Sequence, residues 1–110
     1  MTTTEEMMEF LFERRTPNLP PRGLAEIFDR LLWCMDDNGT ELAHVCRKWL
    51  AGENEAKIRI ALAMTDIFPA DSRDEMTELF AKITSRWLDL KPTCESILAA
   101  WDETMKEKAR

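Results

Sequence analysis

The stretch ENEAKIRIALAMTDIF, which occupies residues 53–68, decides the fold that we expect. Wound as a helix at about 100° per residue, it carries apolar side chains over a wide arc, and Ile58 and Leu62 extend that arc to the far side. A helix that is apolar nearly all round is buried among other helices. The alanines between residues 56 and 63 would let those neighbours approach closely. We therefore expect residues 53–68 to form a central helix.

Outward from this stretch, prolines and glycines divide the chain into six helical segments. We expect the other five at about residues 4–15, 22–37, 41–51, 73–88 and from 92 to the C-terminal charges. Several of them repeat apolar residues at spacings of three and four, which is typical of one buried helix face. The connections are short, so consecutive helices should pack as neighbours. The prediction is an all-α fold, a compact bundle or short solenoid-like stack of five to six helices in a single domain, residues 1–110.

Local signals set the expected helix ends. Thr3 with Glu6, and Ser72 with Glu75, have the spacing of capping boxes. The prolines between residues 17 and 21 should stop the first helix. Asn38-Gly39 is a favoured left-handed end for the second helix, and Thr40 is placed to cap the third. In layout alone, the succession of helical hairpins resembles α-solenoid units such as HEAT repeats, without their signature residues, and no function follows from it.

Composition favours an ordinary folded protein. The 110 residues are 45% hydrophobic and 33% charged, which argues against disorder and suits one core. The three cysteines are odd in number and lie within apolar helical patterns, so we expect no disulfide framework and a reducing compartment. The acidic N-terminus does not resemble a signal peptide, and no apolar run approaches a membrane span. The expected location is cytoplasmic.

The balance of charge points to the kind of partner. Fifteen basic residues against 21 acidic ones give −6. Residues 1–55 hold 11 acids and 6 bases, a balance of −5, whereas residues 56–110 hold 10 and 9, a balance of −1. An acidic surface prefers a basic partner surface and opposes general binding to nucleic acid. We expect another protein with a basic surface as the partner, and neither nucleic acid nor a membrane.

Catalytic and metal-binding patterns are weak. The one histidine, His44, forms an E-x-x-H pair with Glu41, but a di-iron site needs a second such pair. The segment 36–39 resembles a calcium loop, yet aligning its glycine puts Cys34 and Val45 where carboxylates are required. There is no glycine-rich phosphate loop. We therefore expect no enzyme activity, no metal and no cofactor.

Three other patterns leave alternatives open. Basic residues on the third and fourth helices, including Arg47, Lys48, Lys57 and Arg59, would allow a DNA-associated transcriptional regulator. Residues 17–22 match a P-x-x-P-x-basic ligand pattern, although a connector that starts the second helix explains the same prolines. Methionines in the first helix would suit a structural subunit that self-associates, as a homodimer, through that helix.

Trp33 stands apart from the other tryptophans. The expected buried stripe of the second helix is Leu24, Ile27, Phe28, Leu31 and Met35, and Trp33 lies roughly opposite its centre. Its neighbours on that side include Glu26, Asp29 and Asp37, whereas Trp49, Trp87 and Trp101 lie on apolar stripes. Either the first helix folds over Trp33, or Trp33 anchors a partner, since tryptophan is enriched at interface hot spots.

These observations predict a small acidic protein-binding module of the inhibitor, immunity-protein or antitoxin type. Its predicted partner-binding residues are Trp33, Glu26, Asp29 and Asp37.

Overall fold

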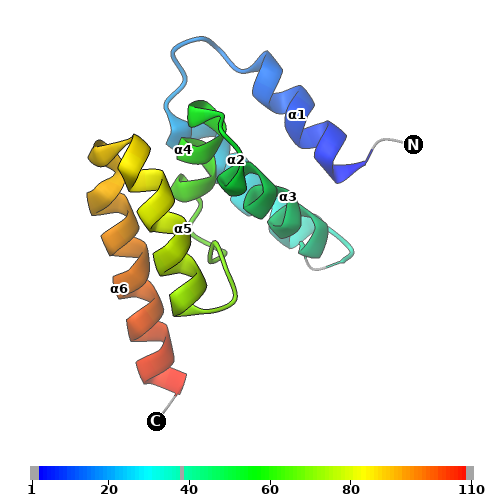
Figure 1. The fold of residues 1–110 in the computed structure, drawn as a ribbon. Coiled ribbons are helices and arrows are strands. Elements are labelled where there is room, and N and C mark those ends of the chain that lie inside the picture. The colour runs from blue at the N-terminus through cyan, green and yellow to red at the C-terminus, as the bar shows by residue number, and fades with distance from the viewer. Residues whose placement is uncertain (1–2, 38, 109–110) are drawn as a thin grey trace. The chain divides into compact units, whose positions relative to one another are not determined.

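The fold is known from a computed structural model, which describes residues 3–37 and 39–108. Within them the structure is all-α, as predicted, and holds no strand (Figure 1). In chain order the elements are α1 (Thr4–Arg14), α2 (Pro21–Cys34), α3 (Thr40–Ala51), α4 (Glu55–Ala63), α5 (Arg73–Arg86), the short 3-10 helix η1 (Leu88–Leu90) and α6 (Lys91–Lys108).

The contacts between residues group the chain into two compact units. The first ends at Ile67 and contains α1 to α4, and the second begins at Phe68 and contains α5, η1 and α6. The single domain expected for residues 1–110 stays a prediction. The surface of interest lies in the first unit.

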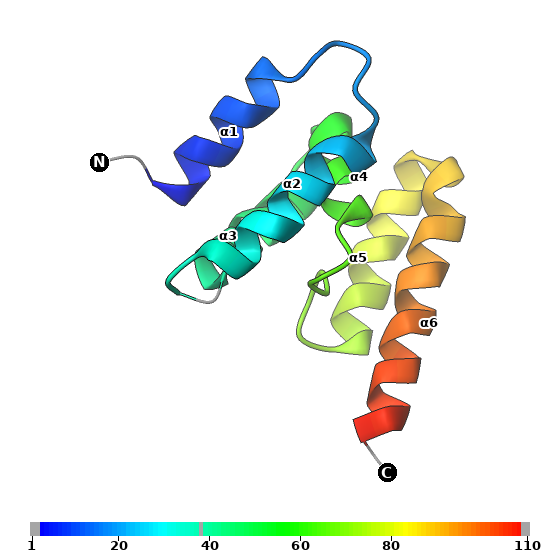
Figure 2. The same cartoon turned by 180° about the vertical axis from the view of Figure 1, so that it is seen from behind.

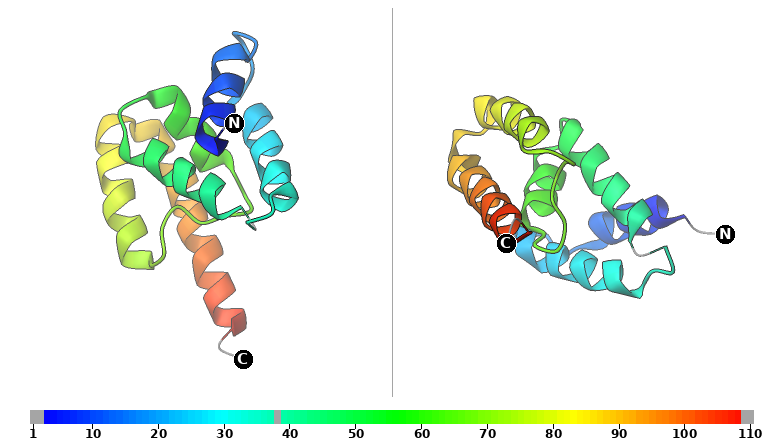
Figure 3. Two further views of the ribbon diagram at one scale, coloured as in Figure 1. Left: turned by 90° about the vertical axis from the view of Figure 1, so that its right-hand side faces the viewer. Right: turned by 90° about the horizontal axis from the view of Figure 1, so that it is seen from below.

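In the first unit α4 packs against both α2 and α3 (Figure 3). Helix α4 is central to this unit, as expected, because it buries Ile58, Ile60 and Leu62. The helix is shorter than the predicted 53–68, because Met64 already has extended backbone. The next two N–H groups, of Thr65 and Asp66, donate to the Asp29 carboxylate instead of continuing the helix.

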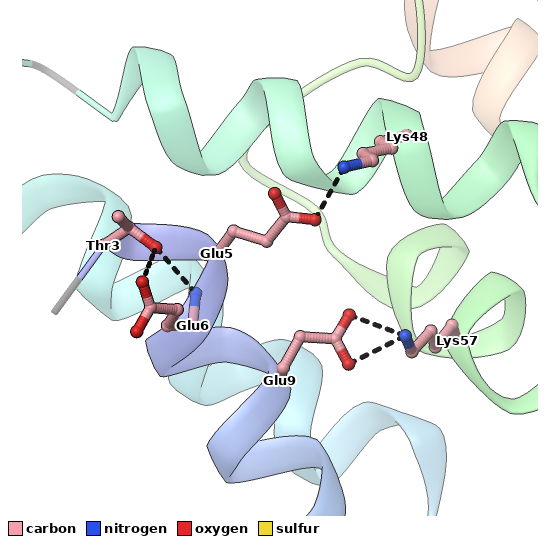
Figure 4. Close-up of polar contacts among 6 residues, drawn as sticks. All are labelled: Thr3, Glu5, Glu6, Glu9, Lys48 and Lys57. Atoms are coloured by element: carbon pink, nitrogen blue, oxygen red, sulfur yellow. Dashed lines mark hydrogen bonds and ion pairs between the residues drawn. The ribbon is translucent and has the colours of Figure 1, made fainter.

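Helix α1 lies on its own unit, in contact with α3 and, less extensively, with α2. Met8 is completely buried, and the Phe12 ring packs edge-on against Trp49 with 5.7 Å between centroids. Two ion pairs hold the helix in place (Figure 4): Lys48 Nζ lies 2.8 Å from a Glu5 carboxylate oxygen, and Lys57 Nζ lies 2.6 Å from a Glu9 oxygen.

The first helix cap forms at Thr3 as predicted, but only half of the capping box is made, because the Glu6 carboxylate accepts from the Thr3 hydroxyl and not from its backbone N–H. Thr3 Oγ1 accepts a hydrogen bond from the Glu6 N–H at 3.1 Å, which gives one of the unpaired amides of the first turn a partner. Figure 4 shows this contact beside the two ion pairs, with Glu5 and Glu9 reaching from α1 toward the lysines. The beginning of α1 is therefore tied both to its own backbone and to its neighbours.

The connection between α2 and α3 departs from the prediction. Helix α2 ends at Cys34, earlier than expected, and Gly39 has left-handed backbone (φ 78°) at the residue before α3. Thr40 does not cap α3; its hydroxyl donates to the Asp37 carbonyl at 2.9 Å. The Asp37 carboxylate takes the capping role, accepting from Gly39 N at 2.9 Å and Glu41 N at 3.0 Å. Asn38, predicted to share in the helix end, lies outside the described residues.

The second unit is a helical hairpin, with α5 and α6 antiparallel and side by side (Figures 1 and 2). Ser72 Oγ accepts from the Glu75 N–H at 3.2 Å, which confirms the predicted cap of α5. Arg73 Nε pairs with Asp102 at 2.9 Å, and the Phe68 and Trp101 rings meet edge-on at 4.9 Å. Trp101 and Trp87 are half-buried, whereas Trp49 is buried.

The cysteines yield a testable difference in reactivity. Cys34 is exposed, whereas Cys46 and Cys94 are buried, and burial raises the pKa of Cys46 to about 12 and that of Cys94 to about 11. Because the thiolate is the reactive form, the two buried thiols should be almost unreactive at mildly alkaline pH. We expect an aromatic disulfide reagent to label Cys34 quickly in the native protein and all three cysteines after denaturation, as followed by mass spectrometry. Fast native labelling of Cys46 would contradict this burial.

Candidate functional site

Trp33, on the last turn of α2, is the most exposed large hydrophobic residue in the described part of the chain. Its exposed fraction is 74%. The alternative in which the first helix covers Trp33 is therefore wrong for this structure. Helix α1 contacts Trp49 through Phe12 instead, because its charged residues are drawn to Lys48 and Lys57 on α3 and α4. This leaves the indole of Trp33 available for contact.

A short chain of hydrogen bonds holds Trp33 in place. Its Nε1–H donates to Asp66 Oδ2 at 2.6 Å. The backbone N–H of Asp66 in turn donates to Asp29 Oδ1 at 3.2 Å, which ties the segment after α4 to the middle of α2. An exposed aromatic side chain that is already ordered loses less conformational entropy when a partner binds. Trp33 therefore combines exposure with a defined orientation.

The predicted acidic neighbours of Trp33 divide into two groups. Asp29 is only 9% exposed and accepts from Thr65 N, Thr65 Oγ1 and Asp66 N at 3.1, 3.3 and 3.2 Å. The Asp37 carboxylate is engaged at the start of α3. Both carboxylates satisfy backbone N–H groups of their own chain: those that Asp37 engages are local, whereas those that Asp29 engages are distant in the sequence. Glu26 is exposed and makes no hydrogen bond or ion pair with the described residues.

Asp66 joins the site, although sequence reasoning missed it. The sequence predicts Asp66 inside the helix 53–68, whereas the structure puts it in the segment that follows α4. One signal was available: Thr65 and Asp66 form a Thr-Asp pair, and such residues favour turns and helix ends over helix interiors. The apolar residues on both sides, Met64 and Ile67, concealed that signal.

A groove adjoins Trp33 in the first unit. Its volume is about 470 Å³. Helix α3 supplies Thr40, His44 and Arg47 to its lining, and Asp66 supplies a carboxylate. The full lining is Leu32, Trp33, Gly39, Thr40, Ala43, His44, Arg47, Asp66 and Ile67. With apolar walls and charges of both signs, the groove suits a side chain of a partner better than a uniformly charged ligand.

Other residues of α2, exposed except for the half-buried Gly23, extend this surface along the helix. We define the α2 outer face as Gly23, Glu26, Ile27, Arg30 and Trp33. Ile27 was predicted in the buried stripe, and this prediction was wrong: it is 45% exposed. The reason is that α4 and α3 cover the side of α2 carrying Leu24, Phe28 and Leu32, and Ile27 lies at the edge of that side. Its exposure adds an apolar contact to the face.

Among residues 3–37 and 39–108, no group of three or more His, Cys, Asp or Glu side chains is arranged to hold a metal ion. In the same residues, no helix has both the length and the apolar character that a membrane span requires.

Comparisons with protein-family models, with curated proteins and with solved structures find no match to this chain. Its function must therefore be inferred from its own residues and their geometry.

Proposed function

We propose that this chain is a small acidic helical module that binds another protein, and that it is not an enzyme. The α2 outer face and the adjoining groove form its binding surface. The observation that carries this proposal is the 74% exposure of Trp33, a residue whose indole N–H is held by Asp66. Tryptophan is among the residues most enriched at the energetic centres of protein interfaces.

Net charge supports a basic partner. The chain carries −6, the exposed Asp66 is bonded to Trp33, and the exposed Glu26 lies on the same face of α2 as Trp33. Complementary charge accelerates encounter between two proteins more than it tightens the final complex. This is the behaviour of inhibitors, immunity proteins and antitoxins that cover a basic surface, and we place the chain in that functional class.

The DNA-associated alternative has less support. Of its four basic residues, Lys48 pairs with Glu5, Lys57 with Glu9 and Arg59 with Glu55. Ammonium and guanidinium groups that already contact carboxylates gain less from phosphates, because the existing ion pair must first be broken. Self-association through α1 is also less favoured, since Met8 is fully buried within its own chain.

Replacing Trp33 with alanine tests the proposed role of this surface. Loss of a hot-spot tryptophan is expected to weaken a complex by about 2 kcal/mol, or about thirtyfold in Kd. The immobilised protein would first capture partners at low salt from a native lysate, and Kd of each purified partner would then be measured for wild type and variant. Stability should change little, because the side chain is mostly exposed.

Leu88→Ala is the matched control for this experiment. Leu88 is 73% exposed, so this substitution removes a comparably exposed apolar side chain, but from the second unit. The proposal requires that Trp33→Ala loses the partner and Leu88→Ala retains it. If both variants bind as the wild type does, Trp33 is not the anchor and the proposed surface is wrong.

A further inference from the structure

We propose that the α2 outer face binds a second copy of the same chain, in an antiparallel arrangement with two-fold symmetry. This inference rests on the proposed binding role of that face, but it assigns the face along α2 to a second copy and leaves the adjoining groove, with Asp66, to a basic partner. It differs from self-association through α1, because the contact is made by α2, on which Glu26, Arg30 and Trp33 are exposed.

The spacing of the face is that of a helix-pairing seam. Gly23, Glu26, Arg30 and Trp33 follow one another at intervals of three, four and three residues, the alternation found at the contact positions of coiled coils. At about 100° per residue they lie within roughly 80° of one another around the helix axis. Ile27 lies at the flank of this seam and is 45% exposed. A partner helix laid along the seam would therefore meet all five residues.

Two-fold symmetry makes the seam complementary to itself. Let the symmetry axis pass at the level of Phe28. Glu26 and Arg30 are each two residues away, about 3 Å along the helix, so each Glu26 lies opposite Arg30 of the second copy. Gly23 and Trp33 are each five residues away, about 7.5 Å, so each Trp33 lies opposite Gly23 of the second copy. Opposite charges thus meet twice, and each Trp33 meets the Leu19 side chain that covers Gly23.

The residues that would pair between copies are available for pairing. Glu26 and Arg30 are exposed and one helical turn apart, yet neither makes a hydrogen bond or ion pair with the described residues. Beside Gly23 the Leu19 side chain occupies the space of the missing side chain: a Cβ on Gly23 would lie 2.7 Å from Leu19 Cδ1. Trp33 of the second copy would therefore pack against an apolar surface formed by Leu19 and the Gly23 backbone.

Charge favours a second copy over a basic protein along this seam. The seam itself holds one carboxylate and one guanidinium, and the exposed Arg22 lies at its edge. Asp29 and Asp37 keep their negative charge, but N–H groups of their own chain engage them, so Glu26 is the carboxylate of the seam itself. A uniformly basic surface would place a cation against Arg30, and unlike a second copy it offers no carboxylate to meet that guanidinium.

Charge reversal tests this pairing directly. The full-length protein and the single variants Glu26→Arg and Arg30→Glu would be examined by sedimentation equilibrium over concentrations reaching the millimolar range. Each single variant puts two like-charged pairs in the seam and should weaken self-association by about tenfold or more. An equimolar mixture of the two variants restores two opposite-charge pairs, since one chain then presents two cations and the other two carboxylates. The mixture should therefore dimerise as the wild type does.

The results separate this inference from the proposed function. A wild-type protein that stays monomeric throughout overturns the inference, as does a dimer that the single variants leave intact, or a mixture that fails to pair. None of these results touches the capture of a different protein through Trp33, which would still support the proposed function. Dimerisation of the mixture also shows that both variants are folded, and circular dichroism of each variant provides the same check independently.

Discussion

Asp29→Ala is expected to lower the free energy of unfolding by about 3 kcal/mol, because hydrogen bonds to a charged group are worth about 1.5–3 kcal/mol and their loss leaves N–H groups without an acceptor. The Asp29 carboxylate is buried and accepts from Thr65 N and Asp66 N, the amides that follow the end of α4. Urea denaturation followed by far-UV circular dichroism measures the change. The midpoint should fall to lower urea, and the cooperativity should stay nearly unchanged.

Two companion variants make this result specific. Glu26→Ala removes an exposed carboxylate from the same helix, one that has no partner among the described residues, so it should alter stability by no more than about 0.5 kcal/mol. Asp29→Asn keeps one acceptor oxygen and should fall between the two. Equal stability of Asp29→Ala and Glu26→Ala would show that Asp29 does not anchor the end of α4.

The same variant bears on the binding surface. Asp29 positions the backbone of Asp66, and the Asp66 carboxylate holds the Trp33 indole N–H. Removing Asp29 should therefore broaden or shift the indole N–H resonance of Trp33, although the two residues do not bond directly. This coupling connects the stability of the first unit to the order of its proposed anchor.

Gly39→Ala is the second large effect that we expect, a loss of about 3 kcal/mol. Left-handed backbone costs a residue with a Cβ about 1–2 kcal/mol, and overpacking a buried site costs a further 1–3 kcal/mol. Gly39 has φ 78° and is buried, and a Cβ there would lie 2.3 Å from Leu32 Cδ1 and 2.6 Å from Leu32 Cγ. Differential scanning calorimetry should record a lower Tm and unfolding enthalpy.

Gly52→Ala is the control that the chain itself provides. Gly52 follows the other end of α3, has φ −85°, and would place a Cβ no closer than 3.4 Å to its nearest neighbour. Alanine at such a position restricts the unfolded chain without straining the folded one, so stability should be unchanged or slightly higher. If Gly39→Ala and Gly52→Ala have the same Tm, the turn between α2 and α3 does not depend on left-handed backbone at Gly39.

The helices and several of their ends follow from local sequence. The prolines near residue 20, the capping pairs Thr3–Glu6 and Ser72–Glu75, and apolar spacing of three and four predicted six helices, and six are present in the described residues. Each of these features depends on residues within a few positions of one another, so a short stretch of sequence is enough to predict it. The prediction was less accurate where an end depends on a distant residue, as at α4.

The composition of the candidate site shows the same limit. Trp33 could be identified because its position opposite an apolar stripe is a local property of one helix. Its acidic neighbours could not be sorted in the same way, since Asp29 and Glu26 differ only in what other segments bring near them. Asp29 lies beside the amides of residues 65 and 66, whereas Glu26 remains exposed. Ile27 was misplaced for a related reason: the width of a buried stripe depends on which helices cover it.

The sequence by itself determined that this protein is all-α, where most of its helices lie and that Trp33 departs from the buried pattern of its helix. The tertiary structure decided that α1 lies against α3 and leaves Trp33 exposed, that Asp29 ends α4 early, and that Asp66 orients the indole. The physical reason is the distance along the chain over which each interaction acts. Helix propensity and capping are satisfied within a turn or two of the chain, whereas burial and the pairing of a carboxylate depend on segments more than thirty residues apart.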